Sequence, residues 1–166
     1  MWITVLQVIF GMVVLLALVL LLAGQMGWLR GKVPTQLGVG QGRLMPPNAT
    51  PNSVSSQAGL FPEHKQRRYA QIEPLRFSGD ADRAFTRVAN ALAALPDTQI
   101  IQRTPEYVYA QCTTQWLKFT DDVELYLDRQ AGVIQVRSAS RLGQKDFGVN
   151  RARVEALRSA LKDVPV

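Results

Sequence analysis

The sequence feature that most constrains the fold is a run without charged residues from Trp2 to Met26. About 20 consecutive apolar residues suffice for a helix to cross the hydrocarbon core of a bilayer. Trp2 and Trp28 bracket the run, and tryptophan is enriched at membrane–water interfaces. The run therefore predicts a transmembrane anchor over residues 2–28. Its length, its uncharged start and the lack of a small-residue cleavage site disfavour a cleaved signal peptide.

Charges near the run predict its orientation. No Lys or Arg precedes it, whereas Arg30 and Lys32 follow it closely. Because basic residues concentrate on the cytoplasmic side of a membrane span, we expect a single-pass protein of a bacterial inner membrane with its C-terminal domain in the cytoplasm.

The composition changes after the apolar run. Residues 29–57 contain four prolines and several glycines and follow neither a helical nor a strand period, which is typical of a linker. Residues 58–166 carry all thirteen acidic residues and regular apolar periodicity, and we assign them to one soluble domain.

The clearest pattern in the domain predicts a β-hairpin over residues 122–140. Apolar and polar residues alternate along 122–128, a short turn with Gly132 follows, and residues 133–140 form the return strand. With Gln130 and Ala131 central in the turn, Leu125 faces Val136 and Leu127 faces Ile134. The same register places Glu124 opposite Arg137, and a slip by one residue would separate the apolar side chains.

The remaining periodicities predict the other elements. We expect strands at 68–77, 98–103 and 106–117, and helices at 79–95 and 149–162. Ser78 or Asp80 is the candidate cap of the first helix, and Asp146 or Asn150 that of the second. The expected fold class is α+β: a five-stranded antiparallel sheet with two helices on one face, in the order β-α-β-β-β-β-α, preceded by one transmembrane helix.

Polar residues gather after the hairpin and predict the candidate site. Arg137 and Arg141 lie near the end of the return strand, and Arg151 lies at the start of the last helix. Three guanidiniums beside free helix amides would bind an anion. Alternatively, nearby carboxylates neutralise the arginines internally, as in other ion-pair networks. The further residues of this site are Ser138, Ser140, Asp146, Asn150, Asp121, Asp122 and Glu124.

Composition argues against several classes of function. The net charge is +6, but from Glu63 onward 16 Lys and Arg face 13 Asp and Glu, with no basic stripe of the kind that binds nucleic acid. Cys112 is the single cysteine and His64 the single histidine, and they match no spacing typical of a metal site. We therefore expect no cofactor, no metal ion and no nucleic-acid partner.

Four short motifs resemble those of the domain of unknown function 1499 family. They are DDVE (121–124), RSASRLG (137–143), DFGVNR (146–151) and PNSVSSQ (51–57), within a resemblance that covers roughly residues 46–164. Where the family usually has a cysteine this chain has Ser53, so no disulfide or metal site at that position carries over. The resemblance adds Asn52, Ser55 and Ser56 to the candidate site, because it implies that their segment folds back onto the domain. Relatives that look exported make a periplasmic domain the alternative location.

Three functions remain open. The first is a membrane-anchored, non-catalytic binding or structural module, which we favour because no catalytic dyad, metal motif or phosphate loop is apparent. The second is a domain that binds an anion or a lipid headgroup through the arginines, with an anionic lipid or a protein as partner. The third, and least favoured, is an enzyme that uses Asp121, Asp122 and Glu124 as acid and base or as metal ligands.

Overall fold

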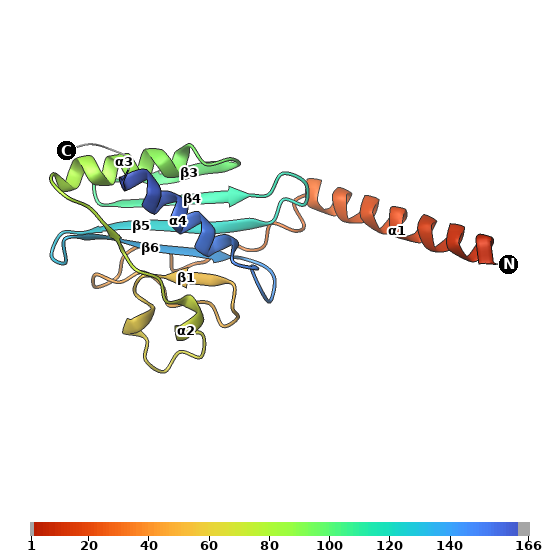
Figure 1. The fold of residues 1–166 in the computed structure, drawn as a ribbon, viewed down its shortest axis with the longest axis horizontal. Helices are drawn as coiled ribbons and strands as arrows, with labels where there is room; N and C mark the ends of the chain where they lie inside the picture. The colour runs from red at the N-terminus through yellow and green to blue at the C-terminus, as the bar shows by residue number, and fades with distance from the viewer. Residues whose placement is uncertain (1, 163–166) are drawn as a thin grey trace.

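The computed structural model describes residues 2–162, and Figure 1 shows a helix projecting from one end of a domain. The projecting helix is α1 (Trp2–Gln25). The elements of the domain are β1 (Ser53–Ser55), η1 (Ala58–Leu60), α2 (Arg67–Ala70), β2 (Leu75–Arg76), α3 (Ala81–Ala93), β3 (Thr98–Arg103), β4 (Tyr107–Thr113), β5 (Thr120–Asp128), β6 (Val133–Ser140) and α4 (Val149–Lys162).

Helix α1 makes little contact with the domain. Its 24 residues span about 36 Å at 1.5 Å per residue. Within residues 2–162 it is the one helix long and apolar enough to cross a membrane, a property that a signal sequence shares. Gly24 is its only buried residue. The apolar side chains of the helix therefore stay outside the protein core.

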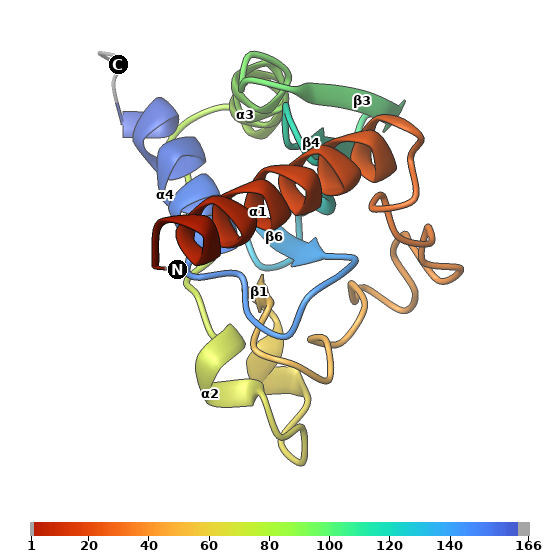
Figure 2. The ribbon, with the colours of Figure 1, turned by 90° about the vertical axis from the view of Figure 1, so that its right-hand side faces the viewer.

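The centre of the domain is an antiparallel sheet in the order β1-β6-β5-β4-β3, with β2 paired to β6. Helices α3 and α4 pack on one face of it, which Figure 2 shows edge-on. Asp80 caps α3, because its carboxylate accepts from the amide of Arg83 at 2.7 Å. The α+β class, the antiparallel sheet and the two covering helices are confirmed, although the sheet has six strands rather than five.

The predicted strand at 68–77 is wrong over most of its length. Residues Arg67–Ala70 form the short helix α2, and only Leu75–Arg76 pair with the sheet. Tyr69, Ile72 and Leu75 are spaced three residues apart, which suits a helical turn better than the alternation of a strand. Pro74 also lacks the amide that a longer strand would donate.

Residues 31–48 lie on the sheet face opposite the helices, as the orange chain of Figure 2 shows, and the segment continues through residue 57 along the edge of the sheet. Leu44 packs there against Tyr107 and Tyr109. The end of the segment forms β1, which pairs with Arg137, Ser138 and Ala139 of β6. The first strand of the sheet therefore lies inside the range 29–57 that the sequence assigns to a linker. Hydrogen bonds to residues distant in the sequence hold this segment, and such bonds leave no periodic pattern in the sequence.

Candidate functional site

The β5–β6 hairpin positions the predicted polar residues on two different faces. Leu125 pairs with Val136 and Leu127 with Ile134, so the predicted register is confirmed. Alternation along β5 then directs Asp122 and Glu124 away from the helices and Asp121 toward them. The candidate residues consequently form two clusters rather than one.

The first cluster is centred on Glu124 and Arg137 under residues 31–48. The Arg137 Nη1 lies 3.4 Å from the Glu124 Oε2, and the side chains are 1% and 0% exposed. Glu124 also accepts from the Tyr107 hydroxyl at 2.8 Å and from the amide of Gly38 at 2.9 Å. Arg137 donates to the Pro46 carbonyl at 3.3 Å and to Asn48 at 3.0 Å. The pair thus fastens residues 31–48 to the sheet.

Asp122 and Arg141 form the second ion pair on the same face. Two nitrogens of Arg141 contact the Asp122 carboxylate, Nη2 to Oδ1 at 2.7 Å and Nε to Oδ2 at 2.9 Å. The Tyr109 hydroxyl donates to Asp122 at 2.7 Å. Burial, followed by the hydrogen bond to Asp122, raises the pKa of Tyr109. Burial and the neighbouring Glu124 likewise raise the pKa of Tyr107. Both phenols therefore stay protonated and act as donors.

The second cluster surrounds the start of α4. Asp146 accepts from the amides of Gly148 at 3.1 Å and Asn150 at 3.3 Å, which confirms it as the helix cap. It also accepts from the Tyr69 hydroxyl. Burial works to raise the pKa of Asp146, but these hydrogen bonds outweigh it and hold the pKa below its usual range. A carboxylate already occupies the helix start where an external anion was expected.

Asn150 joins the strands to α4 at the centre of this cluster. It is fully enclosed. Its Nδ2 donates to the Asn52 carbonyl at 3.1 Å and to the Ser140 Oγ at 2.9 Å, and its Oδ1 accepts from the Ser138 Oγ at 2.6 Å and from Arg153 at 2.8 Å. These contacts saturate the amide, so its role in the fold is structural.

The predicted cluster of three arginines is wrong in one member. Arg151 donates to the backbone carbonyls of Tyr69 at 2.6 Å and Gln71 at 3.1 Å and shares no partner with the other two. Arg153, which sequence reasoning missed, instead joins the second cluster and lies 2.8 Å from the Asp121 carboxylate. The available signal was its position beside Val154 and Leu157 on the inward face of α4.

The segment of Asn52, Ser55 and Ser56 folds back onto β6, as the resemblance implied. Asn52 donates to the Gly143 carbonyl at 2.8 Å, and Ser56 donates to the Gln135 side chain at 2.7 Å. Ser55 lies opposite Arg137 and accepts from a backbone amide nearby. Every one of the predicted site residues thus has a partner inside the protein.

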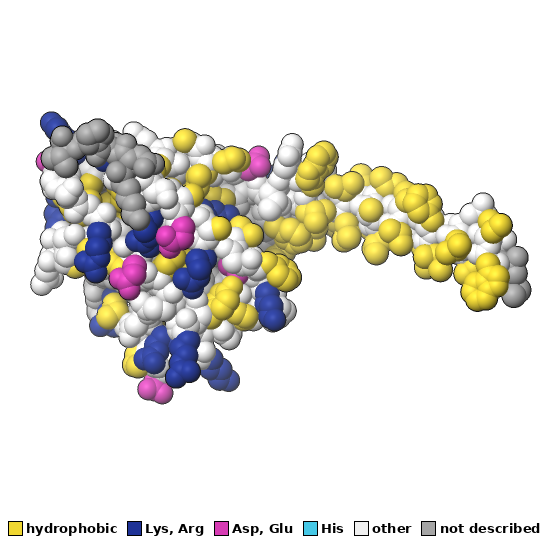
Figure 3. Space-filling model, in the orientation of Figure 1, with side chains coloured by type: hydrophobic (Ala, Val, Ile, Leu, Met, Phe, Trp, Pro, Cys, Tyr) yellow, Lys and Arg dark blue, Asp and Glu magenta, His cyan; other side chains and the backbone are white. Residues whose placement is uncertain are grey.

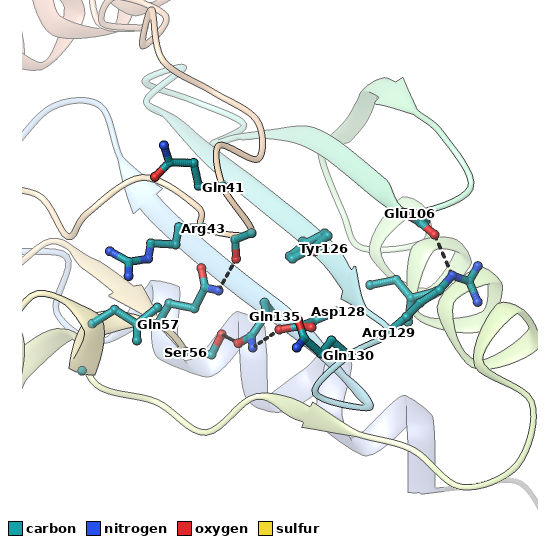
Figure 4. Close-up of a pocket in the computed structure, with 14 residues that line it drawn as sticks. Gln41, Arg43, Ser56, Gln57, Glu106, Tyr126, Asp128, Arg129, Gln130 and Gln135 are labelled. Carbon is teal, nitrogen blue, oxygen red and sulfur yellow. Dashed lines mark hydrogen bonds and ion pairs between the residues drawn. The ribbon is translucent and has the colours of Figure 1, made fainter.

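An open pocket of about 500 Å³ lies beside the β5–β6 turn, at the opposite end of the domain from α1 (Figures 1 and 4). Most of its polar side chains are held by neighbours: Gln135 by Ser56 and Asp128, and Arg129 by Glu106. Its lining also includes Gln41, Arg43, Gln57, Tyr126 and Gln130. Of the predicted residues only Ser56 lines it, because its walls come from segments far apart in the sequence.

The family described as a protein of unknown function (DUF1499) matches residues 43–161. No curated protein and no solved structure matches the chain. Within residues 2–162 no group of three or more His, Cys, Asp or Glu is placed to hold a metal ion. The match begins at Arg43, so it includes β1 and all four segments that carry the motifs.

Proposed function

The chain belongs to the DUF1499 family, and we propose that it is a single-pass membrane protein whose domain is a non-catalytic binding module. The observation that carries this proposal is the contrast between α1 and the predicted site. The helix exposes its apolar side chains, whereas the four charged residues of the predicted site on β5 and beside β6 are enclosed and paired, Glu124 with Arg137 and Asp122 with Arg141.

The exposure of α1 supports retention as an anchor. Its apolar surface covers the whole length of the helix and touches the domain only near Gly24. Such a surface is unfavourable in water and suits a hydrocarbon environment. The bracketing residues Trp2 and Trp28 are exposed at its ends. Arg30 and Lys32 favour a cytoplasmic domain.

The pairing of the charged residues supports a module without catalysis. A general acid, a general base or a metal ligand must reach its substrate or ion. Asp122 and Glu124 instead lie under residues 31–48, each beside an arginine. The same pairing weighs against an anion site at Arg137 and Arg141, because their guanidiniums already have carboxylate partners. The pocket beside the β5–β6 turn is the place we assign to a small polar ligand.

Two measurements test the anchor. After alkaline carbonate extraction of native membranes, the protein should remain in the pellet, and N-terminal sequencing should find the residues of α1 still present. Recovery of a soluble protein that begins after residue 24 would refute the anchor. Reporter fusions at the C-terminus should be active in the cytoplasm, and periplasmic phosphatase activity would reverse the orientation.

A thermal-shift panel of hexoses and amino acids tests the pocket. We expect at least one class to raise the melting temperature, and Arg43→Gln or Gln130→Ala to abolish that rise. The matched control is Arg103→Gln, outside the pocket, where Arg103 contacts Asn90. If no compound shifts the melting temperature, the domain serves a structural role instead.

A further inference from the structure

Two loops at the α1 end of the domain expose large apolar side chains. The loop from Thr114 to Phe119 joins β4 to β5, and the loop from Arg141 to Gly148 joins β6 to α4. Trp116 is 67% exposed and Phe147 is 93% exposed. We call these loops the docking end. Figure 3 shows hydrophobic side chains that continue from α1 onto the adjoining end of the domain.

Helix α1 leaves the domain directly beside the docking end. The Gln25 Nε2 donates to the Trp116 carbonyl at 3.0 Å. Gly24 lies so close to Leu117 that an added Cβ would be 2.7 Å from the Leu117 carbonyl oxygen. Gly31, just after the helix, packs in the same way against Leu142 and Arg141. Both loops therefore lie where the helix emerges, as Figures 1 and 2 show.

Phe147 has no structural reason to be aromatic. Its side chain is almost fully exposed, and its backbone φ of 51° lies in the left-handed region that bulky residues rarely adopt. Its neighbours Asp146 and Gly148 provide the cap and the turn of α4 without it. The exposed position and the unfavourable backbone conformation of this large apolar side chain indicate that an apolar or interfacial environment surrounds it.

Basic side chains accompany the aromatic ones. Arg30, Lys32 and Lys145 are exposed, and Lys118 lies between Trp116 and Phe119. One acidic residue, Asp97, lies near these basic side chains. It lines a shallow pocket together with Arg30 and Lys118. Aromatic rings together with Lys and Arg are the composition of a surface that lies in the headgroup layer of an anionic membrane.

We propose that the docking end rests on the bilayer that α1 spans, with Trp116 and Phe147 in the headgroup layer and the lysines on anionic lipid phosphates. The inference rests on the proposed anchor. It orients the domain, because the pocket beside the β5–β6 turn then faces away from the membrane. The occupant we assign to the docking end is the lipid surface rather than a protein.

Depth-dependent quenching tests this arrangement in the full chain. A variant with Trp2→Phe and Trp28→Phe leaves Trp116 as the sole tryptophan. It is reconstituted into vesicles of phosphatidylcholine and phosphatidylglycerol whose acyl chains are brominated near the headgroup. We expect about a twofold or greater loss of Trp116 fluorescence relative to unbrominated vesicles, as for a ring at the interface. A sole tryptophan at Phe147→Trp, with all three native ones replaced, should behave in the same way.

Matched controls use the far end of the domain. A sole tryptophan at Leu60→Trp, on the pocket rim, should show no loss. The double change Lys118→Glu and Lys145→Glu should reduce the quenching of Trp116, whereas Lys65→Glu should not. If Trp116 is quenched no more than Leu60→Trp, the inference is overturned. Cross-linking of that unquenched Trp116 region to a second copy would indicate self-association instead. Failure of the protein to stay with the vesicles would refute the anchor itself, which is a separate outcome.

Discussion

Arg137 and Glu124 lie opposite each other on β6 and β5, with their charged groups 3.4 Å apart and their side chains wholly enclosed. Burial lowers the pKa of the Arg137 guanidinium, and the Glu124 carboxylate opposes this effect. Arginine stays protonated in proteins, so the two residues form a buried ion pair. The pair also holds the covering segment on the sheet, because the Gly38 amide donates to Glu124 and Arg137 donates to the Asn48 side chain.

Breaking this pair should destabilise the domain strongly. Arg137→Met leaves the Glu124 carboxylate buried without its cation, which costs roughly 3–5 kcal/mol of unfolding free energy. The double change Arg137→Met and Glu124→Leu should recover part of that loss, because no charge is then stranded. Urea unfolding followed by fluorescence measures both values.

The control for this prediction is the exposed ion pair of Arg129 with Asp82 and Glu106. Arg129→Met should cost much less unfolding free energy than Arg137→Met, since water screens exposed pairs. An equal loss of unfolding free energy in Arg129→Met and Arg137→Met would show that the burial of Arg137 does not increase the contribution of its ion pair to stability.

Arg141→Gln distinguishes internal pairing from anion binding. The change removes a two-pronged contact with Asp122 and should lower stability by about 1–3 kcal/mol. Phosphate at constant ionic strength should leave the melting temperature of either protein unchanged. A phosphate-induced rise in the natural protein that vanishes in Arg141→Gln would instead make this face an anion site.

Acid should weaken the cap of α4. The pKa of Asp146 is depressed in the folded protein, so its stabilising effect is complete above the pKa of the unfolded chain, about 3.9 for aspartate, and is lost as the pH falls toward the folded value. Asp146→Ala should cost about 0.5–2 kcal/mol at neutral pH and should flatten the decline of stability below about pH 4. The same slope in both proteins would contradict this assignment. Glu63→Ala, at an exposed residue between η1 and α2, is the control.

Alternation and helical periodicity predicted the hairpin register and the range of α4, because both patterns depend on residues close in sequence. They did not predict the cover over Glu124. Asn48 and Arg137 are 89 residues apart, and their contact leaves no local pattern. The burial of the ion pairs therefore followed only from the three-dimensional path of residues 31–48.

The sequence pattern also failed to identify which arginine of α4, Arg151 or Arg153, joins the predicted cluster. Successive helical residues turn by about 100°, so these two point to nearly opposite sides of α4. The apolar stripe of Val154 and Leu157 places Arg153 nearer the sheet, whereas proximity to the DFGVNR motif favoured Arg151. Selecting the correct arginine required the direction of the helix face as well as the position in the chain.

The joint between α1 and the domain gives the last prediction. Gly24→Leu places side-chain atoms against the Leu117 backbone, where a Cβ alone would already approach to 2.7 Å. Because the Leu117 backbone cannot move aside as a flexible side chain can, the helix must shift away from the loop of Thr114 to Phe119. Hydrogen exchange of the Lys118 and Phe119 amides, which are bonded within that loop, should accelerate. Gly11→Leu, in open space on the same helix, is the matched control and should leave this exchange unchanged. Equal exchange in the two variants would mean that α1 is not seated on the loop, and the domain would then be free to reorient relative to α1.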